Sequence, residues 1–409
     1  MRCEGGVAPV FPGVPLFAIL LTASVVSRSL TCKRLHPKNI DRRKPGGELE
    51  KKNRPMTLFD LARELNVSIS TISRALSRPE MVAPATREKV LAAVKQFGFQ
   101  PNEIARSLRT RQTKTIGIIV PDITNWFFGV IVKAVGEVAK SNGYSVLVCN
   151  ADEDPAGEEH ALNLLRDRKV SGIINCPMGA NLKLWRELKK TGTPVVELDR
   201  VSGLEKVDTV VLDNEKAADM AAAHLIGLGH HRIATIAGPQ HLSNGRARFS
   251  GFKKALRKNS IPLPPEYVEY GDFREGSGHD AAKTLVSLQN PPTAIFIANS
   301  EMAGGAIGAL RECRVKIPTQ LSVVAFDDAH WARYLDPPLT VIAEPTEAMG
   351  RCAAELLLAR LNSRSTSRKL NLEVFPAELI VRKSTAPLRL ARARAAVAVE
   401  ANDKRQIRR

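Results

Sequence analysis

The chain has 409 residues, 44% of them hydrophobic, which excludes a single small domain and allows at least two folded units. Six cysteines without C-x-x-C spacing exclude a disulfide scaffold or zinc module and favour a reducing compartment. The net charge of +18 is uneven: basic residues outnumber acidic ones 11 to 4 in residues 1–55, 10 to 5 in 56–114 and 7 to 2 in 385–409, but 32 to 31 in 115–384. This distribution is typical of a compact anion-binding module attached to a neutral body.

Residues 1–55 contain one apolar run, Val7 to Val26, flanked by Arg2 and Arg28. Such a run resembles a secretion signal or a weak membrane span. Three prolines interrupt it, however, and no cleavage site with small residues stands out. We therefore expect residues 1–55 to be a disordered or over-extended start, with Met56 opening the first folded unit.

The first folded unit begins with a helix signal. Thr57 and Asp60 have the spacing of a capping box, in which a hydroxyl and a carboxylate satisfy free N–H groups of the first turn. Asn66 and Val67 interrupt the pattern, and Ser68 can cap a second helix. The apolar side of these helices is expected to consist of Leu58, Leu61, Ala62, Leu65, Ile72, Ala75 and Leu76. Two short helices with a tight polar turn predict a helix-turn-helix.

The N-terminal end of the second helix carries side chains suited to reading bases. Arg74 can bond guanine through two N–H groups, Ser70 and Ser73 can pair with several base edges, and Ile69 can meet a thymine methyl. The candidate DNA contacts of this unit are Thr57, Ser68, Ile69, Ser70, Thr71, Ser73 and Arg74.

A third helix and a linker complete the unit. Pro84 stands at a first-turn position, and Gly98 follows the end of the helix. Its inward side chains are expected to be Val90, Leu91, Val94 and Phe97. Residues 101–109 then form a helical stretch of one to two turns, and the polar residues 110–114 follow. Taken alone, this stretch predicts a linker.

From residue 115 onward, short β-branched runs alternate with helical stretches. The runs are 116–120, 145–149, 172–175, 195–198, 209–212, 233–237, 294–298 and 322–326. This alternation predicts an α/β fold of parallel, doubly wound sheets covered by helices, long enough for two lobes. The tail after Thr385 is rich in Ala and Arg and is expected to be a solvated end.

The segment from Leu58 to Leu108, followed by TIGIIVPD at 115–122, closely resembles the lactose-repressor/galactose-repressor family of bacterial transcriptional regulators. The resemblance extends to about Ser384. It implies an all-α helix-turn-helix DNA-binding domain at 56–101, a hinge helix and linker at 102–114, a two-lobed periplasmic-binding-protein-like α/β domain for effector binding and dimerisation at 115–384, and a basic tail at 385–409.

In that family the hinge becomes helical on operator DNA, and its leucine enters the minor groove. Such an apolar wedge kinks the duplex at a cost of roughly a few kcal/mol, offset by extra contact. Leu108 holds that position here, and the candidate DNA contacts of the hinge are Asn102, Ala105, Arg106 and Leu108. One departure is Ala83, where the family has Ser or Thr capping the third helix.

The resemblance also implies a ligand cleft. Ligands of open α/β sheets bind beyond the carboxyl ends of strands, and the polar residues that follow predicted strands are Asn125, Asp199, Asn299 and Asp327. Arg248 is expected to grip an anionic or hydroxyl-rich ligand, and Asp327 to bond its hydroxyls. Phe127 or Phe128 would stack on an apolar ring face. The candidate effector contacts are Asn125, Phe127, Phe128, Arg200, Arg248, Asn299 and Asp327.

Two positions of the cleft depart from the family. Trp126 replaces the usual proline, and Ser300 replaces the usual aspartate after Asn299. Both changes leave the identity of the ligand open. His230 and His231 look like a metal pair but follow a glycine at a helix end, where positive charge suits the helix dipole, so we expect a structural role. No catalytic constellation, metal or cofactor is expected.

Three functions compete. The lobes alone would fit a sugar-binding transport protein or an enzyme on an α/β scaffold, but the helix-turn-helix favours a DNA-binding regulator. We expect a cytoplasmic, nucleoid-associated bacterial repressor, controlled by a sugar or sugar derivative and without membrane contact. One helix-turn-helix reads one half-site, so we expect a homodimer on a near-palindromic operator, with a tetramer left open.

Overall fold

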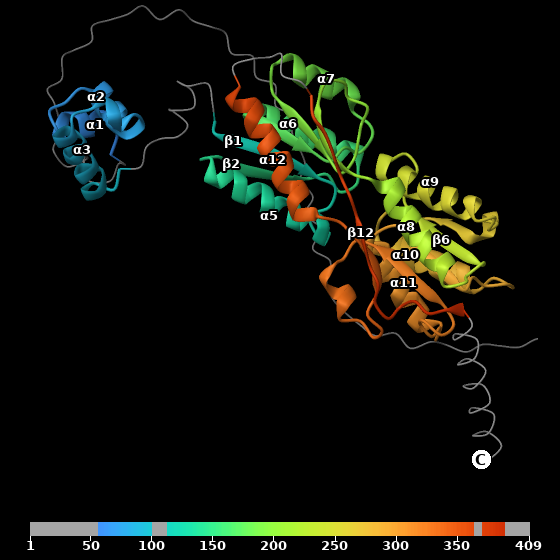
Figure 1. Ribbon diagram of the computed structural model, residues 1–409. Coiled ribbons are helices and arrows are strands. Elements are labelled where there is room, and N and C mark those ends of the chain that lie inside the picture. Colours follow the sequence, from blue (N-terminus) through green and yellow to red (C-terminus); the bar gives the residue numbers. More distant parts are fainter. Residues whose placement is uncertain (1–55, 100–112, 364–369, 389–409) are drawn as a thin grey trace, which may run out of the picture. The chain divides into compact units, whose positions relative to one another are not determined.

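The computed structural model describes residues 56–99, 113–363 and 370–388, which form two compact units divided at residue 100 (Figure 1). The predictions for residues 1–55 and for the hinge positions Asn102, Ala105, Arg106 and Leu108 lie outside these ranges.

The first unit is a bundle of three short helices around one core. Its elements are α1 (Leu58–Glu64), α2 (Ile69–Ser77), the 3₁₀ turn η1 (Pro79–Met81) and α3 (Pro84–Gln96). The expected capping box is present: Thr57 Oγ1 accepts from the Asp60 N–H at 3.2 Å, and Asp60 Oδ2 accepts from the Thr57 N–H at 3.1 Å. Ser68 caps α2, and Asn66 makes the turn with a positive φ of 52°. The buried core consists of Leu61, Ala62, Ile72, Ala75, Val90, Ala93 and Phe99.

Two of the expected core positions in α3 are wrong. Leu91 and Phe97 are 44% and 36% exposed, while Ala93 and Phe99 are buried. The reason is the helix end: Gly98 takes a positive φ of 60°, and the N–H of Phe99 returns to the Val94 carbonyl at 3.1 Å. This Schellman-type turn brings the residue beyond the helix into the core in place of Phe97. As expected, Ala83 provides no side-chain cap.

The second unit has two lobes, each built on a six-stranded sheet. Lobe 1 has the strand order β11-β5-β4-β3-β1-β2, and every neighbouring pair is parallel. Its strands are β1 (Thr115–Val120), β2 (Ser145–Asn150), β3 (Gly172–Asn175), β4 (Val195–Leu198), β5 (Asp208–Leu212) and β11 (Leu372–Phe375). Its helices are α5 (Trp126–Ser141), α6 (Pro155–Asp167), α7 (Leu182–Lys190) and α12 (Thr346–Asn362).

The alternation of side chains along β1 explains how helices cover both faces of this sheet. Ile116 and Ile118 join the apolar cluster of α5 and α12, whereas Ile119 joins the cluster of α6 and α7. Parallel strands buried on both faces need such continuous apolar runs, and this is why the sequence identified these strands.

Lobe 2 repeats the plan with the strand order β12-β10-β9-β8-β6-β7. Only β12 among its strands runs antiparallel to its neighbour, β10. The strands are β6 (Ile233–Ala237), β7 (Val268–Tyr270), β8 (Ala294–Ile297), β9 (Ser322–Phe326), β10 (Thr340–Ala343) and β12 (Glu378–Ile380). The helices are α8 (Asn214–Gly227), α9 (Ser243–Lys258), α10 (Glu275–Val286) and α11 (Ser300–Glu312), with 3₁₀ turns η2 (Pro265–Tyr267) and η3 (His330–Arg333).

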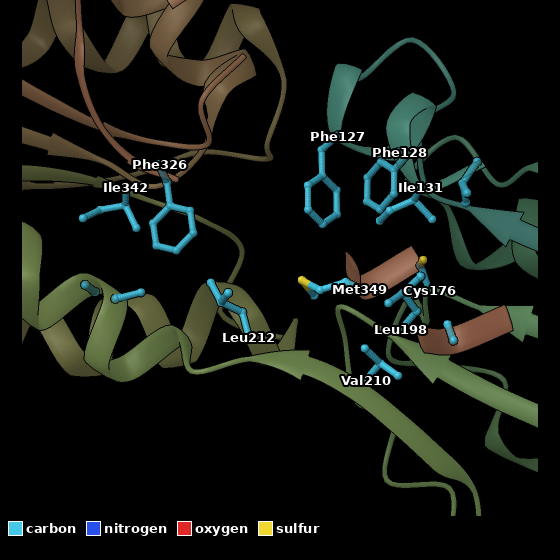
Figure 2. Close-up of a cluster of buried hydrophobic side chains, with 14 of the residues drawn as sticks. Phe127, Phe128, Ile131, Cys176, Leu198, Val210, Leu212, Phe326, Ile342 and Met349 are labelled. Carbon is cyan, nitrogen blue, oxygen red and sulfur yellow. The ribbon is translucent and has the colours of Figure 1, made fainter. Parts of the chain in front are cut away.

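The chain crosses between the lobes three times, at residues 213–214, 344–345 and 376–377. As a result α12, orange-red in Figure 1, packs against the much earlier helix α5. One apolar cluster extends from lobe 1 into lobe 2. Figure 2 shows Phe127 and Phe128 on the lobe 1 side of it and Phe326 and Ile342 on the lobe 2 side.

The start of the expected solvated tail differs from the expectation, because residues 385–388 contact lobe 2. Thr385 Oγ1 lies 3.0 Å from His224 Nε2, and the Ala386 carbonyl lies 3.1 Å from His230 Nε2. The other ring nitrogen of His230 lies 3.0 Å from Thr293 Oγ1. Both nitrogens are therefore used within the protein, in line with the structural role expected for His230.

We expect lobe 2 to lose stability in acid partly through His230. Burial lowers the pKa of this histidine below its ordinary value, so its contribution is present above the unfolded pKa of about 6.5 and is lost as pH falls through the lower folded value. Urea unfolding at pH 7 and pH 5 checks this: His230→Gln should lose less stability over this interval than the unaltered chain. His231→Gln, at the exposed neighbouring position, serves as the control. An equal acid dependence in His230→Gln and the unaltered chain contradicts the prediction.

Candidate functional site

A cavity lies between the two lobes. It brings together all seven candidate effector contacts predicted from the sequence. Its lining consists of Asn125, Phe127, Phe128, Glu153, Asp199, Arg200, Asn244, Arg248, Phe273, Asn299 and Asp327. Sequence reasoning missed Glu153, Asn244 and Phe273. None of them directly follows a predicted strand, and the family resemblance, which supplied Phe127, Phe128 and Arg248, did not include them.

Strand ends and helix starts position the polar residues of this lining. Asn125 caps α5 by accepting from the Phe127 N–H at 2.9 Å, and Asn299 caps α11 by accepting from the Met302 N–H at 3.0 Å. Asp327 directly follows β9 with a φ of 70°. Its Oδ2 accepts from both the N–H and the hydroxyl of Ser300, each at 2.9 Å. Ser300, where the family has aspartate, thus fixes the orientation of Asp327.

Arg248 extends from α9 to the cavity and donates hydrogen bonds to three other groups of the protein. Its Nε donates to Asn214 Oδ1 at 2.7 Å, and its Nη1 donates to the Ala298 carbonyl at 2.8 Å. Its Nη2 donates to Glu344 Oε1 at 2.8 Å. The guanidinium carbon also lies 3.5 Å from the centre of the Phe326 ring, a cation–π contact. Three of the five N–H groups of Arg248 are therefore committed before any ligand arrives.

Arg200, the other guanidinium of the cavity, is held by Glu153. Nη1 donates to Glu153 Oε2 at 2.7 Å and Nη2 donates to Oε1 at 2.6 Å, a bidentate pair. Both side chains belong to lobe 1. The guanidinium carbon also lies 5.7 Å from the ring centre of Phe273 in lobe 2.

Polar contacts bridge the lobes beside the cavity. Asn244 of α9 donates to Asp199 Oδ2 at 3.0 Å, and the Val201 N–H donates to Ser243 Oγ at 2.8 Å. Lobe 2 therefore contacts the segment of lobe 1 that follows β4 through two hydrogen bonds. A ligand that changed the angle between the lobes would have to rearrange these bonds.

Burial shifts the titration of two carboxyls around the cavity. It raises the pKa of Asp199 above its usual value, against the opposing effect of Arg200. Burial also raises the pKa of Glu344, the partner of Arg248, well above its usual range. Both shifts follow from moving a carboxylate out of water.

Helix α2 of the first unit presents the other candidate site. Ile69 is 45% exposed, and Ser70 and Arg74 are also exposed at the surface. Thr71 and Ser73 are partly buried, and Thr57 and Ser68 serve as caps of α1 and α2. Ser68 Oγ also lies 2.7 Å from Ser70 Oγ and 2.8 Å from Thr71 Oγ1. The sequence-predicted base-reading residues therefore share one helix, but only Ile69 and Ser70 begin it, whereas Arg74 lies in its last turn and not at its N-terminal end as expected.

Other kinds of site are not found in the described ranges. No helix there is both long and apolar enough to cross a membrane. Within the same ranges, no group of three or more His, Cys, Asp or Glu side chains is placed to hold a metal ion.

Comparison with known proteins adds an independent finding. A family model described as bacterial regulatory proteins, lacI family, matches residues 57–102, and one described as periplasmic binding protein-like domain matches residues 222–385. Catabolite control protein A of Priestia megaterium is 32% identical over 316 residues, which cover 77% of this chain and 95% of that protein.

Solved structures agree with these relatives. The lac repressor dimer bound to operator and the anti-inducer ONPF has a TM-score of 0.73 at 30% identity, covering 81% of this chain and 100% of that chain. A complex of the transcriptional regulator CelR with cellobiose has a TM-score of 0.62 at 31% identity, covering 80% of this chain and 99% of that chain. Both of these structures are of proteins named as a transcriptional regulator or a repressor.

Proposed function

The chain belongs to the lacI family of bacterial regulatory proteins, and on this premise we propose that it is a repressor whose hold on operator DNA is controlled by a sugar or sugar derivative. The observation that carries the proposal is the gathering of all seven predicted effector contacts around one cavity between the lobes. The similarity to a cellobiose-bound regulator supports a sugar as the ligand class. The protein would act in the bacterial cytoplasm, on the nucleoid.

The mechanism follows from the position of the cavity. A ligand that touches both lobes favours one angle between them, and it shifts DNA affinity by the difference between its binding free energies to the two arrangements. Such coupling amounts to about 1–3 kcal/mol, or roughly 5- to 150-fold in affinity. The test is a titration of the full chain with a DNA duplex selected from random sequence, in the presence and absence of a panel of sugars. The absence of any site preference in the selected DNA would contradict the proposal.

Arg74→Ala is expected to weaken binding to the selected site by roughly 1–3 kcal/mol and to relax preference at one base pair, as for a bidentate base contact. Binding to a panel of single-base variants of the site measures both effects. Arg87→Ala removes the same charge from an exposed position of α3 and should leave the base preference unchanged. If Arg74→Ala also kept its preference at every base pair, Arg74 would be a phosphate contact instead.

We further propose a homodimer on a near-palindromic site, because each protomer supplies one helix-turn-helix and so reads one half-site. The similarity to a repressor dimer bound to operator supports this arrangement. Sedimentation of the full chain should give a dimer at micromolar concentration, or a tetramer of paired dimers. A monomer both with and without DNA would count decisively against it.

A further inference from the structure

The two guanidiniums of the cavity are both paired with carboxylates. Glu153 holds both terminal nitrogens of Arg200, and Glu344 binds Arg248. Recognition of a phosphate or carboxylate by arginine requires a guanidinium edge that is free to form parallel N–H···O bonds. In the bonding pattern of this cavity, Glu153 occupies the edge of Arg200 formed by Nη1 and Nη2, and only the side at Nε is left without a partner.

The charge of the lining also opposes an anion. Three carboxylates, Glu153, Asp199 and Asp327, line the cavity together with the two arginines. Asp199 and Asp327 are 3% and 6% exposed. At such burial water screens charge poorly, so those of the carboxyls that are ionised would repel an anionic ligand.

Two buried atoms indicate what the cavity accepts instead. Among the atoms that the structure describes, Asp199 Oδ1 and Arg200 Nε are buried without a hydrogen-bond partner. Arg200 Nε lies 3.6 Å from Asp199 Oδ2, too far for a hydrogen bond. One atom needs a donor and the other an acceptor, and a hydroxyl group is both. Phe127, Phe128 and Phe273 add apolar surface for the carbon faces of such a ligand.

The backbone holds Glu153 in place. Asp152 and Glu153 both have positive φ, 62° and 52°, and the Glu153 N–H donates to the Pro121 carbonyl at 2.9 Å. From lobe 2, Arg274 Nη2 donates to the Asp152 carbonyl at 2.6 Å. The Glu153 side chain is 13% exposed and forms a bidentate pair with Arg200. Its position in the cavity wall is therefore fixed by both the backbone and the ion pair.

We propose that the effector is uncharged and hydroxyl-bearing, and that Glu153 excludes phosphorylated or carboxylated ligands by balancing the charge of Arg200 and occupying its edge at Nη1 and Nη2. This inference rests on the proposed function, since it concerns the ligand of that same cavity. Glu153 acts here as a specificity-determining residue.

The test uses inorganic phosphate as the probe and the full chain without DNA. Calorimetric titration at constant ionic strength should find no Arg200-dependent phosphate site in the unaltered chain. Glu153→Gln keeps the shape of the side chain but frees the charge of Arg200, so phosphate affinity should rise by about tenfold or more, the size of one charge-assisted hydrogen bond. Adding Arg200→Ala to this variant should abolish the gain.

Glu159→Gln, which removes one negative charge from an exposed position on α6, is the matched control and should titrate like the unaltered chain. Glu153→Ala is the second variant, and it should gain phosphate binding as well. Arg200-dependent phosphate binding by the unaltered chain overturns the proposal, and so does a folded Glu153 variant without a gain. Because this titration contains no DNA, neither result contradicts the proposed repressor function. Conversely, a failure of the chain to bind DNA would not contradict the exclusion of anionic ligands by Glu153.

Discussion

Asp327→Ala is expected to leave binding to the selected DNA site nearly intact and to abolish the response to the sugar that shifts the unaltered chain. Asp327 lines the cavity in lobe 2, whereas the predicted DNA contacts lie in the first unit and the hinge. Removing its carboxylate takes two acceptor oxygens away from the ligand's hydroxyls, and a cavity built to bond a hydroxyl discriminates strongly when that bond is lost. DNA affinity measured across a sugar titration gives both quantities.

The variant has a structural side effect that needs a control. Asp327 also accepts two bonds from Ser300 at the start of α11, so alanine removes support from that helix end as well. Asp327→Asn retains one acceptor for Ser300 and tolerates the positive φ better than alanine does. It should fold like the unaltered chain and respond only at a much higher sugar concentration. A full response in both variants would mean that Asp327 is not an effector contact.

Gly305→Ala is expected to destabilise lobe 2 by about 3 kcal/mol, the upper end of the range for overpacking. Helices α10 and α11 cross so closely that a Cβ on Gly305 would lie 1.9 Å from the Glu275 carbonyl oxygen and 2.9 Å from the His279 nitrogen. Both obstacles are backbone atoms, so no side-chain rotation relieves them and the helices must separate. The midpoint of urea unfolding measures the loss.

Gly308 provides the matched control in the same helix. Nothing lies within 4 Å of the Cβ that alanine would add there, so Gly308→Ala should stabilise the chain by about 0.5–1 kcal/mol through helix propensity. If the two variants unfolded at the same urea concentration, the close crossing at Gly305 would not limit stability.

The sequence predicted those parts of the fold that have local signals. Thr57, Ser68 and Gly98 set helix boundaries through caps, and the structure confirms each. The eight predicted strands are all present. Seven of them are largely buried and form continuous apolar runs, whereas β2 lies at a sheet edge. The strands β7, β10, β11 and β12 were not predicted. Each has only three or four residues, and β7, β11 and β12 lie at sheet edges, where side chains such as Leu372 remain exposed.

Part of the candidate cleft was predicted from strand ends, as for Asp199 and Asp327, and part was implied by the family resemblance, as for Arg248. Glu153 lies three residues beyond β2, in a turn where Asp152 and Glu153 both have positive φ. Neither residue is a glycine, so the sequence does not indicate this turn. Asn244 and Phe273 reach the cavity from lobe 2 through long-range packing. The preference for a neutral ligand depends on Glu153 and Arg200, which are 47 residues apart, and no sequence pattern encodes their pairing.

The hydrogen bonds of Arg248 connect a proposed effector contact to the segments that join the lobes. Asn214 and Glu344, two of its partners, stand in two of the three segments that connect the lobes. A rotation of one lobe relative to the other would change the backbone conformation of these segments. It would therefore lengthen or reorient the hydrogen bonds that Arg248 donates from Nε and Nη2. If a ligand bonds this guanidinium, as proposed, it acts directly on two of the segments about which the lobes would turn.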